Sequence, residues 1–227
     1  MNKYLCKGAV FDFNGTLFVD EEKQYEAWRN IVEKYTGKTF TRDNFESTFL
    51  GHTNTEIGTL LSEMVPEKID PKIISDDKEV EYRKICRADP SCLHLVKGAE
   101  SLFDELKKRN MPFTIATASE ISNVRFYYET FKLDRWFSWD KIVYDDSTFP
   151  GKPAPDTYLK AAELIGQAPR DCFAVEDTLP GIHSAESAGI GVVFARNSSL
   201  QIEQIKNDPG IAAVIQDFTG FAEKYLI

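Results

Sequence analysis

The sequence predicts an α/β fold in which a parallel sheet lies between two layers of helices and carries an inserted all-helical domain. Short apolar runs recur along the 227-residue chain, and helical patterns alternate with them over most of its length. Strands that alternate with helices are joined by right-handed crossovers, which produce a parallel sheet covered on both faces. One stretch, from about residue 20 to 95, contains helical patterns and no convincing buried strand.

The predicted strands are short apolar runs of the kind that form buried strands. The first is KGAVFDF at residues 7–13, and it stops at the glycine of the following NGT. The others are PFTIAT at 112–117, CFAV at 172–175, IGVVFA at 190–195 and the weaker IAAVI at 211–215.

Helical patterns lie between these strands and fill the insert. AESLFDELKKRN at 99–110 places its apolar residues on one helical face, and Pro112 ends the pattern. The insert carries EEKQYEAWRNIVEKYTG, TRDNFESTFLG, TNTEIGTLLSEMV and PKIISDDKEVEYRKICR. We predict that residues 1–19 and 96–227 form the core domain and that residues 20–95 form the helical domain.

Composition and charge limit the partners of the protein. The net charge is −9 and the pI is about 5.0, which argues against nucleic acid or an anionic membrane as the main partner. The four cysteines are too scattered for a disulfide framework or a zinc site, and neither a signal peptide nor a membrane span is visible. We therefore expect a cytoplasmic protein, monomeric or weakly dimeric, that binds a small molecule.

The first candidate motif is FDFNGTL, residues 11–17, at the end of the first predicted strand. The carboxylate of Asp12 could attack phosphorus and form an aspartyl-phosphate, which divides one displacement into two easier ones. Gly15 and Thr16 allow a tight turn and offer backbone amides to phosphate oxygens. Taken alone, an aspartate at a strand end more often caps a turn or a helix.

Two further motifs supply phosphate-binding groups. TIATAS ends the second predicted strand with Thr117, Ala118 and Ser119, whose hydroxyl and N–H groups can hold a phosphate oxygen. The alternative is that Thr117 caps the next helix. In GKPAPD, Lys152 precedes a helix that a proline opens, so that a cation and a helix N-terminus converge on one anion. By itself, such a lysine is more often solvated.

The fourth motif, FAVEDTLPGI, ends another predicted strand in the carboxylates of Glu176 and Asp177. Mg²⁺ is usually bound by one or two carboxylates together with backbone oxygen, water and substrate phosphate. The alternative role of Asp177 is to cap the helix that begins near Thr178. Because ligands of open α/β sheets bind beyond the carboxyl ends of the strands, the four motifs together predict one phosphate site that contains a metal.

In this order the four motifs resemble the signature motifs of the haloacid dehalogenase (HAD) superfamily, and the resemblance covers essentially the whole chain. It implies a Rossmann-like core with a helical cap inserted after the first motif, and it is closest to the branch of β-phosphoglucomutase and small sugar-phosphate phosphatases. By this resemblance Asp12 is the nucleophile, and Thr117 and Lys152 bind the transferred phosphoryl group. The implied ligands of Mg²⁺ are Asp12, the backbone carbonyl of Asn14, Asp177 and, less firmly, Glu176.

The first motif departs from the family pattern at Asn14, where the phosphatases usually have a second aspartate. That aspartate protonates the leaving oxygen and then deprotonates the attacking water, which an amide cannot do. General acid–base catalysis contributes about 10² to 10⁴-fold, so we expect slow or leaving-group-selective turnover. Three explanations stay open: a substrate with a good leaving group, another proton donor such as one from the cap, or an engineered asparagine.

The segment FLGHTNTEIG at 49–58 resembles the specificity loop of the cap. In the mutase, a lysine and an arginine of this loop grip a second phosphate, and here Leu50 and Asn54 stand at those places. A bisphosphate needs a strong cationic clamp, so its absence argues against the mutase. His52 is a candidate for binding a substrate hydroxyl or transferring a proton, with an exposed loop histidine as an equal alternative. Asn54 and His52 are therefore candidate substrate-binding residues.

These observations predict a Mg²⁺-dependent HAD-type phosphatase that acts on a small phosphorylated metabolite, such as a sugar phosphate, through an aspartyl-phosphate on Asp12. One alternative is a phosphosugar mutase of the β-phosphoglucomutase type. The other is a weakly active or inactive protein that binds phosphate in a regulatory role.

Overall fold

The computed structural model describes residues 2–49, 53–197 and 202–227. It divides into two compact units. The core unit is Met1–Val19 with His94–Ile227, and the helical unit is Asp20–Leu93. The second division falls at Leu93–His94, whereas the sequence placed it after residue 95.

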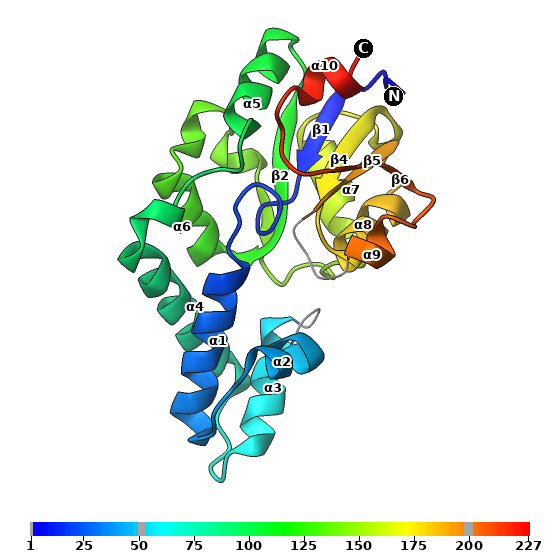
Figure 1. The fold of residues 1–227 in the computed structure, drawn as a ribbon. Coiled ribbons are helices and arrows are strands. Elements are labelled where there is room, and N and C mark those ends of the chain that lie inside the picture. Colours follow the sequence, from blue (N-terminus) through cyan, green and yellow to red (C-terminus); the bar gives the residue numbers. More distant parts are fainter. Residues whose placement is uncertain (1, 50–52, 198–201) are drawn as a thin grey trace. The chain divides into compact units, whose positions relative to one another are not determined.

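The core unit is built on a six-stranded parallel sheet in the order β3-β2-β1-β4-β5-β6 (Figure 1). Its strands are β1 (Gly8–Phe11), β2 (Phe113–Glu120), β3 (Val143–Asp145), β4 (Cys172–Glu176), β5 (Val192–Arg196) and β6 (Ile211–Ile215). The predicted α/β fold with a parallel sheet is therefore confirmed, and five of the strands coincide with the predicted apolar runs. The edge strand β3 was missed, because its sequence VYD is too short to form an apolar run.

One face of the sheet is covered by α7 (Asp156–Leu164) and α8 (Leu179–Ser187). These helices share a core with small and branched strand residues such as Val10, Ala174 and Val193. Small strand side chains let the helix backbones approach closely, which suits the alanine-rich faces of both helices.

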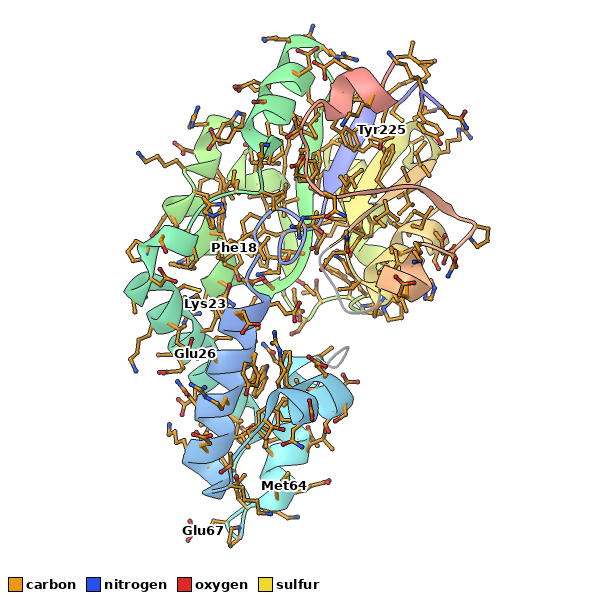
Figure 2. All side chains as sticks on the ribbon, in the orientation of Figure 1. Phe18, Lys23, Glu26, Met64, Glu67 and Tyr225 are labelled. Carbon is orange, nitrogen blue, oxygen red and sulfur yellow. The ribbon has the colours of Figure 1, made fainter. Side chains whose placement is uncertain are left out.

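The opposite face of the sheet is aromatic. Successive residues of a strand point to opposite faces, so Phe11 lies on the other side from Val10. Phe11 makes edge-to-face contacts with Phe103 of α5 (Ala99–Lys108) and with Phe173 of β4. Helix α10 (Phe221–Tyr225) covers the same face, on which Tyr225, labelled in Figure 2, packs against Phe194 of β5. The sheet is therefore the middle layer of three.

The remaining elements of the core unit are short or connect the strands. They are α6 (Ile121–Thr130), α9 (Ile202–Ile205) and the 3₁₀ turns η3 (Leu133–Arg135), η4 (Trp139–Lys141) and η5 (Pro169–Asp171). Within the described ranges, no helix is long and apolar enough to cross a membrane.

The helical unit has no strand among its described residues. It contains α1 (Glu21–Thr36), α2 (Arg42–Asn44), a π-helical turn η1 (Phe45–Phe49), α3 (Asn54–Met64), α4 (Pro71–Ala88) and a 3₁₀ turn η2 (Pro90–Cys92). Trp28, Ile31, Phe49 and Leu61 belong to its own apolar core. Thr53 caps α3 in a capping box with Glu56, which fixes where this helix begins.

The register of the sheet brings the sequence motifs together. Phe11 on the central strand β1 pairs with Ile115 on β2 and with Val175 on β4. Asp12, Thr117 and Asp177 follow these three residues by one or two positions. Because parallel strands all end at the same edge of the sheet, the three motifs meet there.

Candidate active site

Asp12 lies at the centre of the candidate site, directly after β1. Its backbone N–H donates to the carbonyl oxygen of Val175 on β4 at 3.0 Å, which extends the sheet pairing by one residue. The residue is only 7% exposed. A buried carboxylate is costly unless it is paired, so its partners identify the chemistry of the site.

The partner of Asp12 is Lys152, whose side chain is 7% exposed. The Nζ atom lies 2.7 Å from Oδ1 of Asp12 and 2.5 Å from Oε1 of Glu176. It also donates to the carbonyl oxygen of Ala116 at 3.0 Å. The ammonium therefore connects Asp12, directly after β1, with Ala116 on β2 and with Glu176, the last residue of β4.

Burial changes the protonation of this cluster. It raises the pKa of Asp12 from 3.8 to about 7, against the opposing effect of Lys152 and with a further increase from the charge of Glu176. Burial lowers the pKa of Lys152, but Asp12 and Glu176 outweigh it and hold the pKa above its ordinary value. Lys152 is thus a permanent cation, whereas the charge of Asp12 depends on what else binds beside it.

Glu176 uses both carboxylate oxygens within the protein. Oε1 pairs with Lys152 and accepts the hydroxyl of Tyr158 at 3.2 Å. Oε2 accepts the backbone N–H groups of Asp177 and Thr178 at 2.9 and 3.2 Å, and the hydroxyl of Thr178 at 3.2 Å. With these contacts Glu176 fixes the position of Lys152 and shapes the turn that carries Asp177.

The turn after β1 packs directly against Asp177. Gly15 has φ of 76°, and a Cβ atom built on it would lie 2.0 Å from Oδ2 of Asp177. Thr16 donates its hydroxyl to Oδ1 of Asp177 at 3.3 Å. Phe18, labelled in Figure 2, closes the turn, because its carbonyl accepts the N–H of Gly15 at 2.7 Å. Only glycine satisfies both the backbone conformation and the close approach.

The side chain of Asn14 is held at both ends of its amide. Ser119 donates its hydroxyl to Oδ1 at 2.7 Å, and Nδ2 donates to the hydroxyl of Tyr127 at 2.9 Å. Tyr127 is buried and stacks on Phe13 with ring centroids 4.5 Å apart. These contacts fix the orientation of the residue at which the first motif departs from the family pattern.

Thr117, Ala118 and Ser119 lie within β2, which continues to Glu120 and does not end at Thr117 as the motif predicted. Thr117 is 2% exposed, and its hydroxyl oxygen accepts the backbone N–H of Ser119 at 3.1 Å. Lys152 reaches the carbonyl of Ala116, one residue earlier. The hydroxyl of Thr117, the backbone of Ala118 and the ammonium of Lys152 therefore belong to one edge of the sheet.

The carboxylates of this edge fit a divalent cation. Asp12, Glu176 and Asp177 are all buried, and each offers an oxygen atom within 4.8 Å of the other two. Hard oxygen donors of this kind match Mg²⁺. Because both oxygens of Glu176 already have partners, Asp12 and Asp177 are the better suited of the three to bind metal.

The predicted substrate-binding residues Asn54 and His52 belong to the segment that forms the helical unit. Asn54 begins α3 in the helical unit, where its amide donates to the carboxylate of Glu79. His52 and the preceding residues Leu50 and Gly51 lie outside the described residues.

Sequence analysis missed two tyrosines that contact the predicted residues. Tyr127 on α6 bonds Asn14, and Tyr158 on α7 bonds Glu176. Both lie within helical patterns in which an aromatic residue is normally read as core. Tyr158 lies six residues after Lys152, on the helix that follows GKPAPD. This nearness in sequence was the one indication that Tyr158 could lie near the candidate site.

Comparison with known proteins agrees with this arrangement. The model of one protein family, described as haloacid dehalogenase-like hydrolase, matches residues 6–189. A crystal structure of a HAD hydrolase of family IA, variant 3, from Entamoeba histolytica superposes with a TM-score of 0.86. It is 36% identical to this chain, and the match covers 94% of each protein.

Two curated relatives are named as phosphatases. A probable pseudouridine-5′-phosphatase from Drosophila melanogaster is 30% identical over 96% of this chain and 94% of its own length. A phosphorylated carbohydrates phosphatase from Thermotoga maritima is 24% identical over 92% and 94% of the two chains. Proteins named beta-phosphoglucomutase are also among the matches.

Proposed function

Because the chain belongs to the haloacid dehalogenase-like hydrolase family, we propose that it is a phosphatase that acts on a small phosphorylated metabolite through a phosphorylated Asp12. The family predicted from the four motifs is confirmed. The observation that carries the proposal is the buried ion pair of Asp12 and Lys152 beside Asp177. Relatives named as phosphatases of carbohydrates and of pseudouridine 5′-phosphate point to a phosphate monoester of a sugar or nucleoside.

In the first step a carboxylate oxygen of Asp12 forms a bond to phosphorus while the bond from phosphorus to the leaving oxygen breaks. Lys152 supplies a fixed positive charge 2.7 Å from the nucleophile, where charge on the phosphoryl oxygens can be neutralised. The hydroxyl of Thr117 and the amide of Ala118 offer donors to the same oxygens. The amides of Gly15 and Thr16, which the sequence also predicted to bind phosphate, already donate to the carbonyls of Phe18 and Phe13. In the second step water attacks phosphorus and releases phosphate, which restores the Asp12 carboxylate.

A Mg²⁺ ion would be held by Asp12, Asp177 and the backbone carbonyl of Asn14. Glu176, with both oxygens engaged, serves in this proposal to position Lys152. When bound, the ion would supply further charge neutralisation at the phosphoryl group and would favour the ionised form of Asp12, whose pKa burial raises to about 7.

Asn14 makes proton transfer the weak point of the cycle. Its amide is oriented by Ser119 and Tyr127, but it can neither protonate the leaving oxygen nor deprotonate water. We therefore propose that turnover is slow on ordinary phosphomonoesters and faster on substrates whose leaving group departs as a stable anion.

The helical unit is proposed to act as the cap that selects the substrate and excludes water during the reaction. Asn54 and His52 are the residues proposed to contact the part of the substrate remote from phosphorus.

A panel of phosphorylated metabolites tests the proposal. Purified protein with Mg²⁺ is expected to release phosphate from at least one sugar or nucleoside phosphate, and Asp12→Asn is expected to remove this activity. Asp140→Asn, which changes an exposed aspartate of η4, is the matched control and should leave the rate unchanged. Equal rates for Asp12→Asn and the wild type would refute the proposed nucleophile.

Asn14 also favours a second candidate function, a phosphate-binding protein with little or no turnover. Such a protein would bind Mg²⁺ and a phosphate analogue but release no phosphate from any substrate of the panel. In that case Asn14→Asp should create phosphatase activity, because the rest of the site is already assembled.

A further inference from the structure

Arg196 is a buried cation next to the proposed metal ligands, and none of the four motifs contains it. It ends β5, where the preceding residue Ala195 pairs with Glu176 on β4. Arg196 therefore lies beside Asp177 at the carboxyl edge of the sheet. The residue is 8% exposed, which is rare for an arginine without a functional or structural partner.

The guanidinium group of Arg196 binds the turn that follows the nucleophile. Its Nη1 atom donates to the backbone carbonyl oxygen of Gly15. The same glycine approaches Asp177 so closely that a Cβ atom on it would lie 2.0 Å from Oδ2. Gly15 is thus contacted by a buried cation from β5 and by a carboxylate from the end of β4.

The charge of Arg196 acts on Asp177 as well. Burial lowers the pKa of Arg196, while Asp177 and Asp217 counteract this effect, so that the positive charge lies within electrostatic reach of both carboxylates. A guanidinium stays protonated in proteins. Arg196 therefore provides a permanent positive charge near Asp177. Lys152 provides one next to Asp12.

One hydrogen-bond donor of Arg196, its Nε–H group, has no acceptor among the described residues. The Nε atom is buried. Burial of an unsatisfied donor costs free energy, and an apolar side chain at the end of β5 would avoid this cost. A role of Arg196 in the candidate active site therefore explains its burial better than a contribution to the stability of the sheet does.

We propose that Arg196 is a positioning residue of the phosphoryl-transfer site, which fixes the Gly15 peptide and Asp177 relative to each other. The Asn14 carbonyl immediately precedes Gly15, so holding Gly15 sets the separation of two of the oxygen ligands proposed for Mg²⁺. This inference rests on the proposed function. Residues that orient metal ligands typically contribute about 10- to 100-fold to metal affinity or activity.

Three variants separate the contributions of Arg196. Arg196→Met keeps the approximate length of the side chain but removes the charge and the donors. Arg196→Gln keeps an N–H donor for Gly15 without the charge, and Arg196→Lys keeps the charge. Arg109→Gln is the matched control, because Arg109 also donates Nη1 to a backbone carbonyl, that of Ile227, but is exposed and lies before the opposite end of β2.

Two measurements on the full-length variants decide the outcome. Isothermal titration with Mg²⁺ is expected to show at least 10-fold weaker binding for Arg196→Met, a smaller loss for Arg196→Lys, and no change for Arg109→Gln. Phosphate release at saturating substrate should show the same order in kcat, with KM changed less than kcat. Melting temperatures, measured in parallel, identify any variant that is merely unfolded at the assay temperature.

A purely structural role would give a different result. In that case the melting temperature of Arg196→Met would fall while the Mg²⁺ affinity and kcat of the folded protein stayed within about 2-fold of the wild type, and this would overturn the proposal. If the wild type released no phosphate, the proposed function would fail, yet the Mg²⁺ titration would still decide the role of Arg196. Absence of Mg²⁺ binding in the wild type would overturn both.

Discussion

At the scale of single residues, the candidate site places the proposed nucleophile Asp12 close to Asn14, an amide that cannot transfer protons. Asp12 is paired with Lys152 at 2.7 Å, and Asn14 is fixed by Ser119 and Tyr127. The sequence was sufficient to select Asp12, Asn14 and Lys152, because each stands in a motif with a distinct chemistry. The sequence could not reveal Tyr127. Its contact with Asn14 depends on how α6 packs in the folded protein beside the turn that follows β1.

Replacement of Asn14 by aspartate should restore acid–base catalysis. We expect Asn14→Asp to raise kcat/KM, which reports on phosphoryl transfer to Asp12, by about 10² to 10⁴-fold for substrates with poor leaving groups, and by much less for aryl phosphates with acidic phenols. The reason is that a good leaving group needs no proton. The measurement is kcat/KM for a series of aryl and alkyl phosphates of increasing leaving-group pKa.

The slope of log kcat/KM against leaving-group pKa is the decisive quantity in that series. It should be steeper for the wild type than for Asn14→Asp. Asp140→Asn in the Asn14→Asp background serves as control, because it removes an exposed carboxylate of η4 that is not part of the candidate site. Parallel slopes for the two proteins would show that residue 14 is not the missing proton donor.

At the scale of elements, the carboxyl ends of β1, β2 and β4 and the turn after β1 create the site. The five apolar runs predicted as strands are found in the sheet, because a strand buried on both faces must be apolar along its length. The edge strand β3 escaped prediction, since three residues of which only Val143 is buried leave no such signature. Pairing order and register, which bring Asp12 and Asp177 together, come from tertiary packing and not from local sequence.

The turn after β1 should tolerate no side chain at Gly15. Gly15→Ala places a methyl group 2.0 Å from Asp177, in a backbone conformation with φ of 76°. We expect a loss of Mg²⁺ affinity of at least 10-fold, because Asp177 must move. Calorimetric titration with Mg²⁺ measures this change.

Gly166→Ala is the matched control for that experiment. Gly166 also has a positive φ, 71°, but a Cβ atom there would meet nothing within 4 Å. It should therefore carry a similar backbone strain of about 1 kcal/mol and leave Mg²⁺ binding unchanged. Equal Mg²⁺ affinities for the two variants would contradict the contact between Gly15 and Asp177.

At the scale of the whole molecule, the buried carboxylate of Asp12 couples protonation to folding. Its pKa is about 7 in the folded protein without metal and 3.8 in the unfolded chain. The folded state therefore binds the proton of the Asp12 carboxyl group more tightly than the unfolded chain does. The stabilisation that results from this difference is complete below about pH 4 and is lost as the pH rises through 7. Other groups titrate as well, so the contribution must be isolated with a variant.

Asp12→Asn provides that comparison, because an amide has nearly the same shape and does not titrate. In the absence of divalent metal, we expect the melting temperature of the wild type to fall relative to that of Asp12→Asn between pH 5 and pH 8. Differential scanning calorimetry in the presence of a chelator measures the difference. A difference that stays constant over this range would show that the pKa of Asp12 is not raised in the folded protein.

The central claim is that Asp12 carries the phosphoryl group during turnover. Rapid acid quench of the protein with Mg²⁺ and a substrate found in the metabolite panel, followed by peptide mass spectrometry, tests it most directly. One added phosphoryl group is expected on the peptide that contains Asp12. It should be absent in Asp12→Asn and should accumulate more in the wild type than in Asn14→Asp, because Asn14 slows its release. Full turnover with no phosphorylated Asp12 at any quench time would contradict the account.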